Sequence, residues 1–198
     1  MRIIAGSARN RRIEAPEGKH TRPTLDRVRE NLFNILQTRI YASVVLDLFA
    51  GSGALSLEAL SRGARSAVMC DIDRNANRVE RMNTESLGFT DRTEIYCCDW
   101  HTALKKLQDR QMQFDLVFLD PPYVMTDLRA VLDRLYPCVR NDGLVIIEHE
   151  AGKAVITGER FKVCDERRWG FCGMTFLEKT AEESNQAENS QDETEGMR

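Results

Sequence analysis

The sequence predicts an α/β protein built on a single doubly wound, mostly parallel sheet. Short apolar segments alternate along the middle of the chain with segments of helical periodicity, and this pattern is typical of parallel strands covered on both faces. After residue 150 the pattern changes to strand and turn, which predicts a closing β-hairpin. With 198 residues, the chain can fill one core but not two comfortable domains.

The first expected helix precedes the sheet. Residues 24–40, "TLDRVRENLFNILQTRI", carry apolar side chains at helical spacing, and Thr24 is suited to the N-cap. The first strand is expected at 43–49, "SVVLDLF", which is β-branched and apolar. The helix that follows, 54–62, ends before Gly63, where a C-terminal glycine is common.

The same alternation places the later elements. Further strands are expected at 66–72, 93–98, 114–120 and 143–150. Further helices are expected at about 74–87, 100–108 and 126–136, the first of them ended by Gly88. The segment "FKVCDERRWGFCGMTFLEK" supplies the two strands of the closing hairpin.

Composition excludes several classes of protein. The chain is 42% hydrophobic and 30% charged, as in ordinary globular proteins. It has no apolar run near the roughly 18–20 residues of a membrane span, and its first residues lack a signal-peptide core. We therefore expect a cytoplasmic protein without membrane contact. Six cysteines without a C-x-x-C pair and three scattered histidines favour buried free thiols and no metal site.

Charge is distributed unevenly along the chain. Residues 181–198 hold six acids and one base, within an overall net charge of −3, and this composition predicts a disordered acidic tail. Residues 1–29 hold eight bases against three acids, which suits either a polyanion or a solvated face. The expected organisation is a basic N-terminal extension at 1–23, a catalytic domain at 24–180 and the tail at 181–198.

Candidate ligand contacts lie where the strands end, since ligands of such sheets bind at the carboxyl edge. Gly51 and Gly53 let the backbone turn sharply in front of a helix, although Ser56 stands where a dinucleotide fingerprint has its third glycine. Asp71 follows Gly51 by 20 residues, a spacing that suits a carboxylate on ribose hydroxyls. Asp73 fits better as the N-cap of the next helix.

The third and fourth strands also end in acids. Asp99 could accept a hydrogen bond from an adenine amine or cap the following helix, and the residues leave both interpretations open. The fourth strand ends in "FLDPPY", where Asp120 is followed by Pro121 and Pro122 and then by the ring of Tyr123. Because proline fixes φ and lacks a donor, these residues end the strand and hold an acceptor rigidly beside a ring.

Two long stretches resemble a known family. "LDLFAGSGALSLEALSRGA" and "FDLVFLDPPY" look like class I S-adenosylmethionine-dependent methyltransferases, which have a Rossmann-like fold. "MRIIAGSARNRRIEAP" and "TRPTLDRVRENLFNIL" resemble more specifically the bacterial 16S rRNA guanine-N2 methyltransferases. The resemblance covers about residues 1–178. Asp71 stands where the family usually has glutamate, Ser56 where it has glycine, and "ARNRR" replaces a glycine-containing basic turn.

The resemblance implies a cofactor and a set of roles. S-adenosylmethionine would be bound by Asp47, Phe49, Gly51, Gly53, Asp71 and Asp99. Asp120 and the Pro121 carbonyl, fixed by Pro122, would accept the two N–H groups of a base amine, and Tyr123 would stack on the base. Phosphate contacts would come from among Arg9, Arg11, Arg12, Arg22 and Arg27.

The expected partner is 16S rRNA or a partly assembled small-subunit particle. The D-P-P-Y motif is shared with amine methyltransferases that act on DNA adenine or cytosine or on protein glutamine, so these remain the main alternative. A nicotinamide-dependent oxidoreductase would share the glycine turn but have no use for D-P-P-Y. A non-catalytic RNA-binding module would explain the basic start but not a nucleoside pocket.

Overall fold

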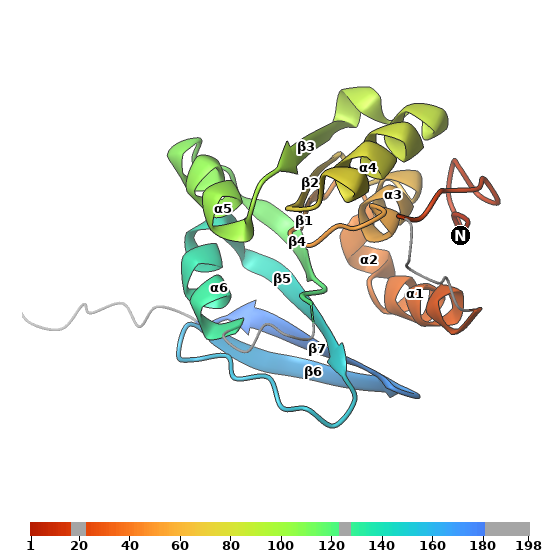
Figure 1. Cartoon of the computed structure of the whole chain (residues 1–198). Coiled ribbons are helices and arrows are strands. Elements are labelled where there is room, and N and C mark those ends of the chain that lie inside the picture. The colour runs from red at the N-terminus through yellow and green to blue at the C-terminus, as the bar shows by residue number, and fades with distance from the viewer. Residues whose placement is uncertain (17–22, 123–127, 181–198) are drawn as a thin grey trace, which may run out of the picture.

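A computed structural model describes residues 1–16, 23–122 and 128–180. Over these residues seven strands form one sheet in the order β3-β2-β1-β4-β5-β7-β6 (Figure 1). They are β1 (Val44–Asp47), β2 (Ser66–Asp71), β3 (Thr93–Cys97), β4 (Phe114–Leu119), β5 (Val139–Glu150), β6 (Phe161–Trp169) and β7 (Cys172–Lys179). Strands β1 to β5 pair in parallel, whereas β7 pairs antiparallel with both β5 and β6. The mostly parallel sheet and the closing hairpin are confirmed.

Helices cover both faces of this sheet. They are α1 (Pro23–Ile35), α2 (Gln37–Ile40), α3 (Ala54–Ser61), α4 (Arg74–Leu87), α5 (Trp100–Asp109) and α6 (Leu128–Leu135). Figure 1 shows α1 to α4 on one side of the sheet and α5 and α6 on the other. Each side has its own buried cluster, with Phe33 and Phe118 in the first and Phe114 and Leu132 in the second. No described helix is long and apolar enough to cross a membrane.

The bounds of several elements differ from the predicted ones, among them those of the first helix and of β5. The helix expected at 24–40 begins at Pro23 and is interrupted at Leu36. Pro23 occupies the first turn, where its missing N–H costs nothing, so Thr24 lies inside the helix rather than at its cap. Strand β5 begins at Val139, four residues early, because Val139 already pairs with Phe114 ahead of a register shift in β4.

The N-terminal segment, residues 1–16, is folded onto α3. Its side chains Ile3, Ala8 and Ile13 belong to the core on the α1–α4 side of the sheet, and Arg2 and Arg12 form an antiparallel bridge. Gly6 adopts a φ of +82°, and a Cβ added there would lie 1.9 Å from the Ser61 carbonyl oxygen. Only glycine allows this close backbone contact. The segment expected as an extension therefore contributes to the core, and the acidic tail lies outside the described residues.

Candidate active site

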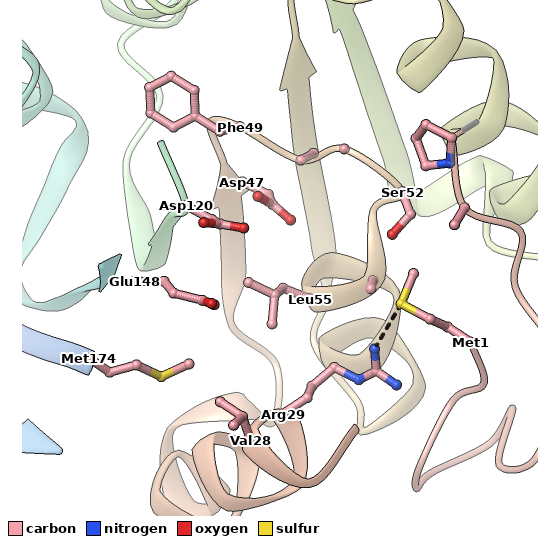
Figure 2. A pocket seen from close by; sticks show the side chains of 15 residues that line it. Met1, Val28, Arg29, Asp47, Phe49, Ser52, Leu55, Asp120, Glu148 and Met174 are labelled. Carbon is pink, nitrogen blue, oxygen red and sulfur yellow. Dashed lines mark hydrogen bonds between the residues drawn. The ribbon is translucent and has the colours of Figure 1, made fainter. Parts of the chain in front are cut away.

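A pocket opens where the strand order reverses between β1 and β4, as expected for a doubly wound sheet. Its cavity of about 170 Å³ is bounded by the N-terminal segment, α1, the loop after β1 and the ends of β4, β5 and β7 (Figure 2). Polar groups enter it from Arg29, Asp47, Ser52, Asp120 and Glu148. Apolar walls come from Met1, Ala15, Pro16, Val28, Phe49, Ala50, Ala54, Leu55 and Met174.

The loop after β1 approaches the pocket through its backbone. Gly53 has a φ of +75°, and a Cβ on it would lie 2.6 Å from the Met69 Sδ, so a side chain is excluded there. The Gly51 N–H donates to the Asp71 Oδ2 at 2.9 Å. The two residues expected to act together are thus in direct contact, and Asp71 holds the loop in place.

Asp47 is buried at the end of β1, beneath this loop. Its Oδ2 accepts a hydrogen bond from the Ser56 hydroxyl at 3.1 Å, whereas its Oδ1 has no hydrogen-bond partner within the described chain. Burial raises the pKa of Asp47 to about 7. A buried acceptor without a partner in a pocket wall fits a cationic donor, such as an amine of a ligand. Ser56, which departs from the family's glycine, therefore positions this carboxylate.

The acids at the ends of β2 and β3 have distinct contacts. Asp73 caps α4 by accepting from the Asn75 N–H at 2.8 Å, as predicted. Asp71 accepts from the backbone N–H of Asp73 as well as that of Gly51. Asp99 accepts from the Thr102 N–H and hydroxyl, and these hydrogen bonds lower its pKa. The N-cap interpretation of Asp99 is therefore observed, and its contact with an adenine amine stays a prediction.

The end of β4 supplies the last predicted group. Asp120 is exposed and lines the pocket directly after β4, and Figure 2 shows its carboxyl group pointing into the same space as that of Asp47. Pro121 and Pro122 follow without regular secondary structure. Tyr123 lies outside the described residues, so its stacking role stays a prediction.

The candidate phosphate contacts lie on the N-terminal segment and α1. Arg9, Arg11, Arg12 and Arg27 are exposed, and the Arg11 guanidinium donates to the Ser86 carbonyl. Arg27 forms no ion pair with the described residues, and its exposed charge faces solvent. Arg22 lies outside the described residues.

Sequence reasoning missed a buried ionic network beside the pocket. Glu58, on α3, accepts from the Ile4 and Ala5 backbone N–H groups at 2.7 and 3.0 Å. It also pairs with Arg62 at 2.7 Å and lies 4.0 Å from the buried guanidinium of Arg29. A single acid in the apolar helix "ALSLEALS" is the signal that could have identified it. This network joins the N-terminal segment and α1 to the helix that follows the glycine loop.

A second buried acid, Glu80 on α4, carries the first testable prediction. Neither of its oxygens has a hydrogen-bond partner in the part of the chain that the structure describes, and burial raises its pKa to about 8. Because this folded-state pKa lies above the unfolded value, the native state binds the proton more tightly. Stability is therefore lost as the pH rises from about 4.5 to 8.

Replacing Glu80 by glutamine should remove this loss. In calorimetric scans, the melting temperature of Glu80→Gln minus that of the parent should be several degrees larger at pH 8 than at pH 5. Glu85→Gln, an exposed change on the same helix, should show no such trend. A variant-to-parent difference that is the same at both pH values would contradict the shifted titration.

The cysteines form no disulfide in the described residues. Cys70 and Cys138 are buried as expected, but Cys97 and Cys164 are exposed, so burial was wrong for these two. Strand β3, which carries Cys97, lies at the edge of the sheet, where Glu94 and Cys97 are exposed. No group of three or more potential metal-ligating side chains gathers in the described chain.

Comparisons with known proteins agree with this geometry. The family model described as "Conserved hypothetical protein 95" matches residues 1–178. Ribosomal RNA small subunit methyltransferase D of Haemophilus influenzae is 35% identical over 86% of this chain and 89% of its own. The Escherichia coli protein of the same name is 34% identical over 79% and 78%. A solved structure of a hypothetical protein from Thermus thermophilus has a TM-score of 0.77 at 28% identity, covering 90% of this chain and 99% of that one.

Proposed function

The chain belongs to the family described as conserved hypothetical protein 95, and we propose that it is an S-adenosylmethionine-dependent methyltransferase. Its proposed substrate is the exocyclic N2 amine of one guanine in small-subunit ribosomal RNA. The relatives named as small subunit methyltransferases support RNA as the substrate, in preference to DNA bases or protein glutamine.

One structural observation carries the proposal. The pocket at the strand-order reversal brings the glycine loop and an Asp47 oxygen that has no partner among the described residues together with Asp120 from the neighbouring strand. The first two are groups that a nucleoside with a charged amino-acid tail would need. The third is an acceptor suited to an amine. A nicotinamide-dependent oxidoreductase would not need this third group.

The residues at the carboxyl ends of β1, β2 and β3 fit the cofactor. S-adenosylmethionine, when bound, supplies a methyl group carried on a positively charged sulfur. Asp47 would accept from its amine and Asp71 from its ribose hydroxyls, because a carboxylate oxygen can accept more than one hydrogen bond. The glycine loop would approach it through backbone atoms, and Phe49 would contact it at the pocket wall. Asp99 would lie near the adenine amine.

The chain's own contribution to the reaction is to aim and polarise the amine. An exocyclic amine is a poor nucleophile because its lone pair is delocalised into the base. Asp120 would accept one N–H and the Pro121 carbonyl the other, which holds the nitrogen with its lone pair directed at the methyl group. The carboxylate would also stabilise the positive charge that develops on the nitrogen as its bond to the methyl carbon forms and the carbon–sulfur bond breaks, with its electron pair left on sulfur. The surplus proton leaves afterwards, to Asp120 or to water.

The test of this function is a map of methylated nucleosides. Small-subunit RNA from cells lacking the protein should have lost one N2-methylguanine, and adding purified protein with S-adenosylmethionine should restore it. An unchanged map, or restoration of a different methylated nucleoside, would refute the proposed substrate.

The cofactor assignment gives a second prediction. Asp71→Ala should weaken S-adenosylmethionine binding about 10–100-fold, the loss expected for one charge-assisted hydrogen bond of roughly 1.5–3 kcal/mol. Titration calorimetry measures this directly. Asp73→Ala is the matched control, since Asp73 is the adjacent N-cap of α4. Equal affinities for the parent and Asp71→Ala would remove Asp71 from the cofactor site.

The basic segment gives a third prediction. Arg9, Arg11 and Arg12 are exposed on the N-terminal segment, which also borders the pocket through Ala15 and Pro16. Replacing the three arginines by glutamine should weaken RNA binding and lower its salt slope by about 2–3 units, because each phosphate contact contributes about one. Fluorescence titration against salt concentration measures both quantities.

The matched control replaces three exposed arginines elsewhere by glutamine, namely Arg129, Arg134 and Arg140. Arg129 and Arg134 lie on α6, on the opposite side of the sheet from the N-terminal segment (Figure 1), and Arg140 lies at the start of β5. This control set should leave the salt slope unchanged. If the two triple variants behave alike, the N-terminal arginines form a solvated face and RNA docks elsewhere.

A further inference from the structure

A row of acids lies at the carboxyl edge of the sheet, and one of them has no role so far. Asp47, Asp120 and Glu148 come from the ends of the neighbouring strands β1, β4 and β5. Leu119 pairs in register with Ile147, so the next residues, Asp120 and Glu148, are neighbours across the two strands, about 5 Å apart by the usual strand spacing.

Side-chain alternation places these acids on one face of the sheet. Successive side chains of a strand point to opposite faces. Phe118 and Ile146, two residues before Asp120 and Glu148, both belong to the core on the α1–α4 side. Asp120 and Glu148 therefore project to that same side, and Figure 2 shows both carboxyl groups pointing into the pocket.

The surroundings of Glu148 are unfavourable for a carboxylate unless a donor approaches it. Val28, Leu55 and Met174 provide apolar walls of the same pocket, and the ion pairs among the described residues do not include Glu148. Burial is the main cause that raises the pKa of Glu148 to about 7, and the negative charge of Asp120 adds to it. A hydrogen bond with Cys172 lowers the same pKa. Two adjacent acids in one pocket point to a ligand that presents adjacent donors.

Guanine is the base that presents such donors. Its ring N1–H lies beside its N2 amine on the Watson–Crick edge, so two neighbouring acceptors can engage the two groups together. Adenine and cytosine instead have an unprotonated ring nitrogen next to their exocyclic amine. A carboxylate facing that nitrogen would repel its lone pair, and a polar site rejects a ligand that leaves its groups unpaired.

We propose that Glu148 accepts the N1–H of the target guanine while Asp120 engages the N2 amine, so that Glu148 selects guanine over other bases. This inference rests on the proposed function and adds a specificity-determining residue to it. Glu148 contacts an edge of the base that does not react, so its effect is on which base is positioned for transfer.

The test compares guanine with 2-aminopurine, which keeps the 2-amine but has an unprotonated N1. Small-subunit particles are reconstituted with RNA that carries either base at the mapped position. Single-turnover methylation is measured at pH 8, above the raised pKa of Glu148. The parent should prefer guanine by about 100-fold or more. In Glu148→Gln the guanine rate should fall and the preference should shrink at least about 10-fold, since an amide can donate to N1.

Controls separate this role from a structural one. Glu150→Gln changes an exposed acid two residues on, which pairs with Lys153, and should keep the parent's preference. If Glu148→Gln folds poorly, as seen in its melting temperature and S-adenosylmethionine affinity, the ratio of the guanine rate to the 2-aminopurine rate is measured in Glu148→Ala instead. A preference in these variants equal to the parent's would overturn the inference. Absence of N2 methylation by the parent would instead refute the proposed function.

Discussion

Asp120→Ala is expected to lower the single-turnover rate of methyl transfer by about 10²–10³-fold, while S-adenosylmethionine affinity stays within a few-fold of the parent's. The size is that of losing one preorganised group aimed at developing charge. Asp120 stands at the end of β4, in the pocket but off the glycine loop, so its loss should act on the transition state rather than on cofactor binding.

Rapid-quench measurement with saturating cofactor and RNA gives the rate, and calorimetry gives the affinity. Asp142→Asn is the matched control, because Asp142 is an exposed acid near the start of β5, at the opposite end of the strand from the pocket. Asp120→Asn tests whether an uncharged acceptor suffices. The charge of Asp120 raises the pKa of both Asp47 and Glu148, so both variants should lower the pKa of these two acids. A near-parental rate in Asp120→Ala would overturn the assigned role.

Local sequence was enough to place part of the pocket. In a parallel sheet all strands expose their carboxyl ends at one edge, so acids that follow apolar strands are brought together without knowledge of the packing. Asp71 and Asp120 were both singled out in this way. Asp71 contacts Gly51 and Asp120 lines the pocket, while their roles toward cofactor and base stay predictions. Glu148 carries the same signal at the end of "GLVIIEHE", but it was assigned no role.

The contacts of the N-terminal segment could not be predicted in this way. Glu58 meets the Ile4 and Ala5 N–H groups across more than 50 residues of chain, and no periodicity within either segment indicates that pairing. The high basic charge of residues 1–29 indicated a solvent-facing arm, whereas Arg29 is buried between Asp26 and Glu58. Net charge describes a segment as a whole and does not show which of its side chains are desolvated.

Two buried acids, Asp47 in the pocket wall and Glu80 on α4, lower the stability of the free protein. Asp47 has an unpartnered oxygen within the described chain and Glu80 has two, and burial raises the pKa of both acids. Buried acids without partners destabilise a fold. Ligands that bring cationic or N–H donors to Asp47 would offset part of this cost, so cofactor binding should raise the melting temperature.

Glu58→Ala is expected to lower the free energy of unfolding by about 3–5 kcal/mol, the cost of removing one partner from a buried ionic network. Glu58 is 0% exposed, and its loss would leave the Ile4 and Ala5 N–H groups without their acceptor and the buried Arg29 guanidinium without one of its two acids. For a chain of this length the melting temperature should fall by roughly 6–20 °C.

Chemical denaturation of the parent, Glu58→Ala and Glu58→Gln measures this change. The glutamine variant keeps one oxygen acceptor and should lose less stability than the alanine variant. Glu85→Ala removes an exposed acid from α4 and should change stability by no more than about 0.5 kcal/mol. Because Glu58 fastens Ile4 and Ala5 to α3, amide hydrogen exchange in residues 3–13 should accelerate more than in β4 and β5. A loss below about 1 kcal/mol in Glu58→Ala would show that the N-terminal segment is held by its apolar side chains alone.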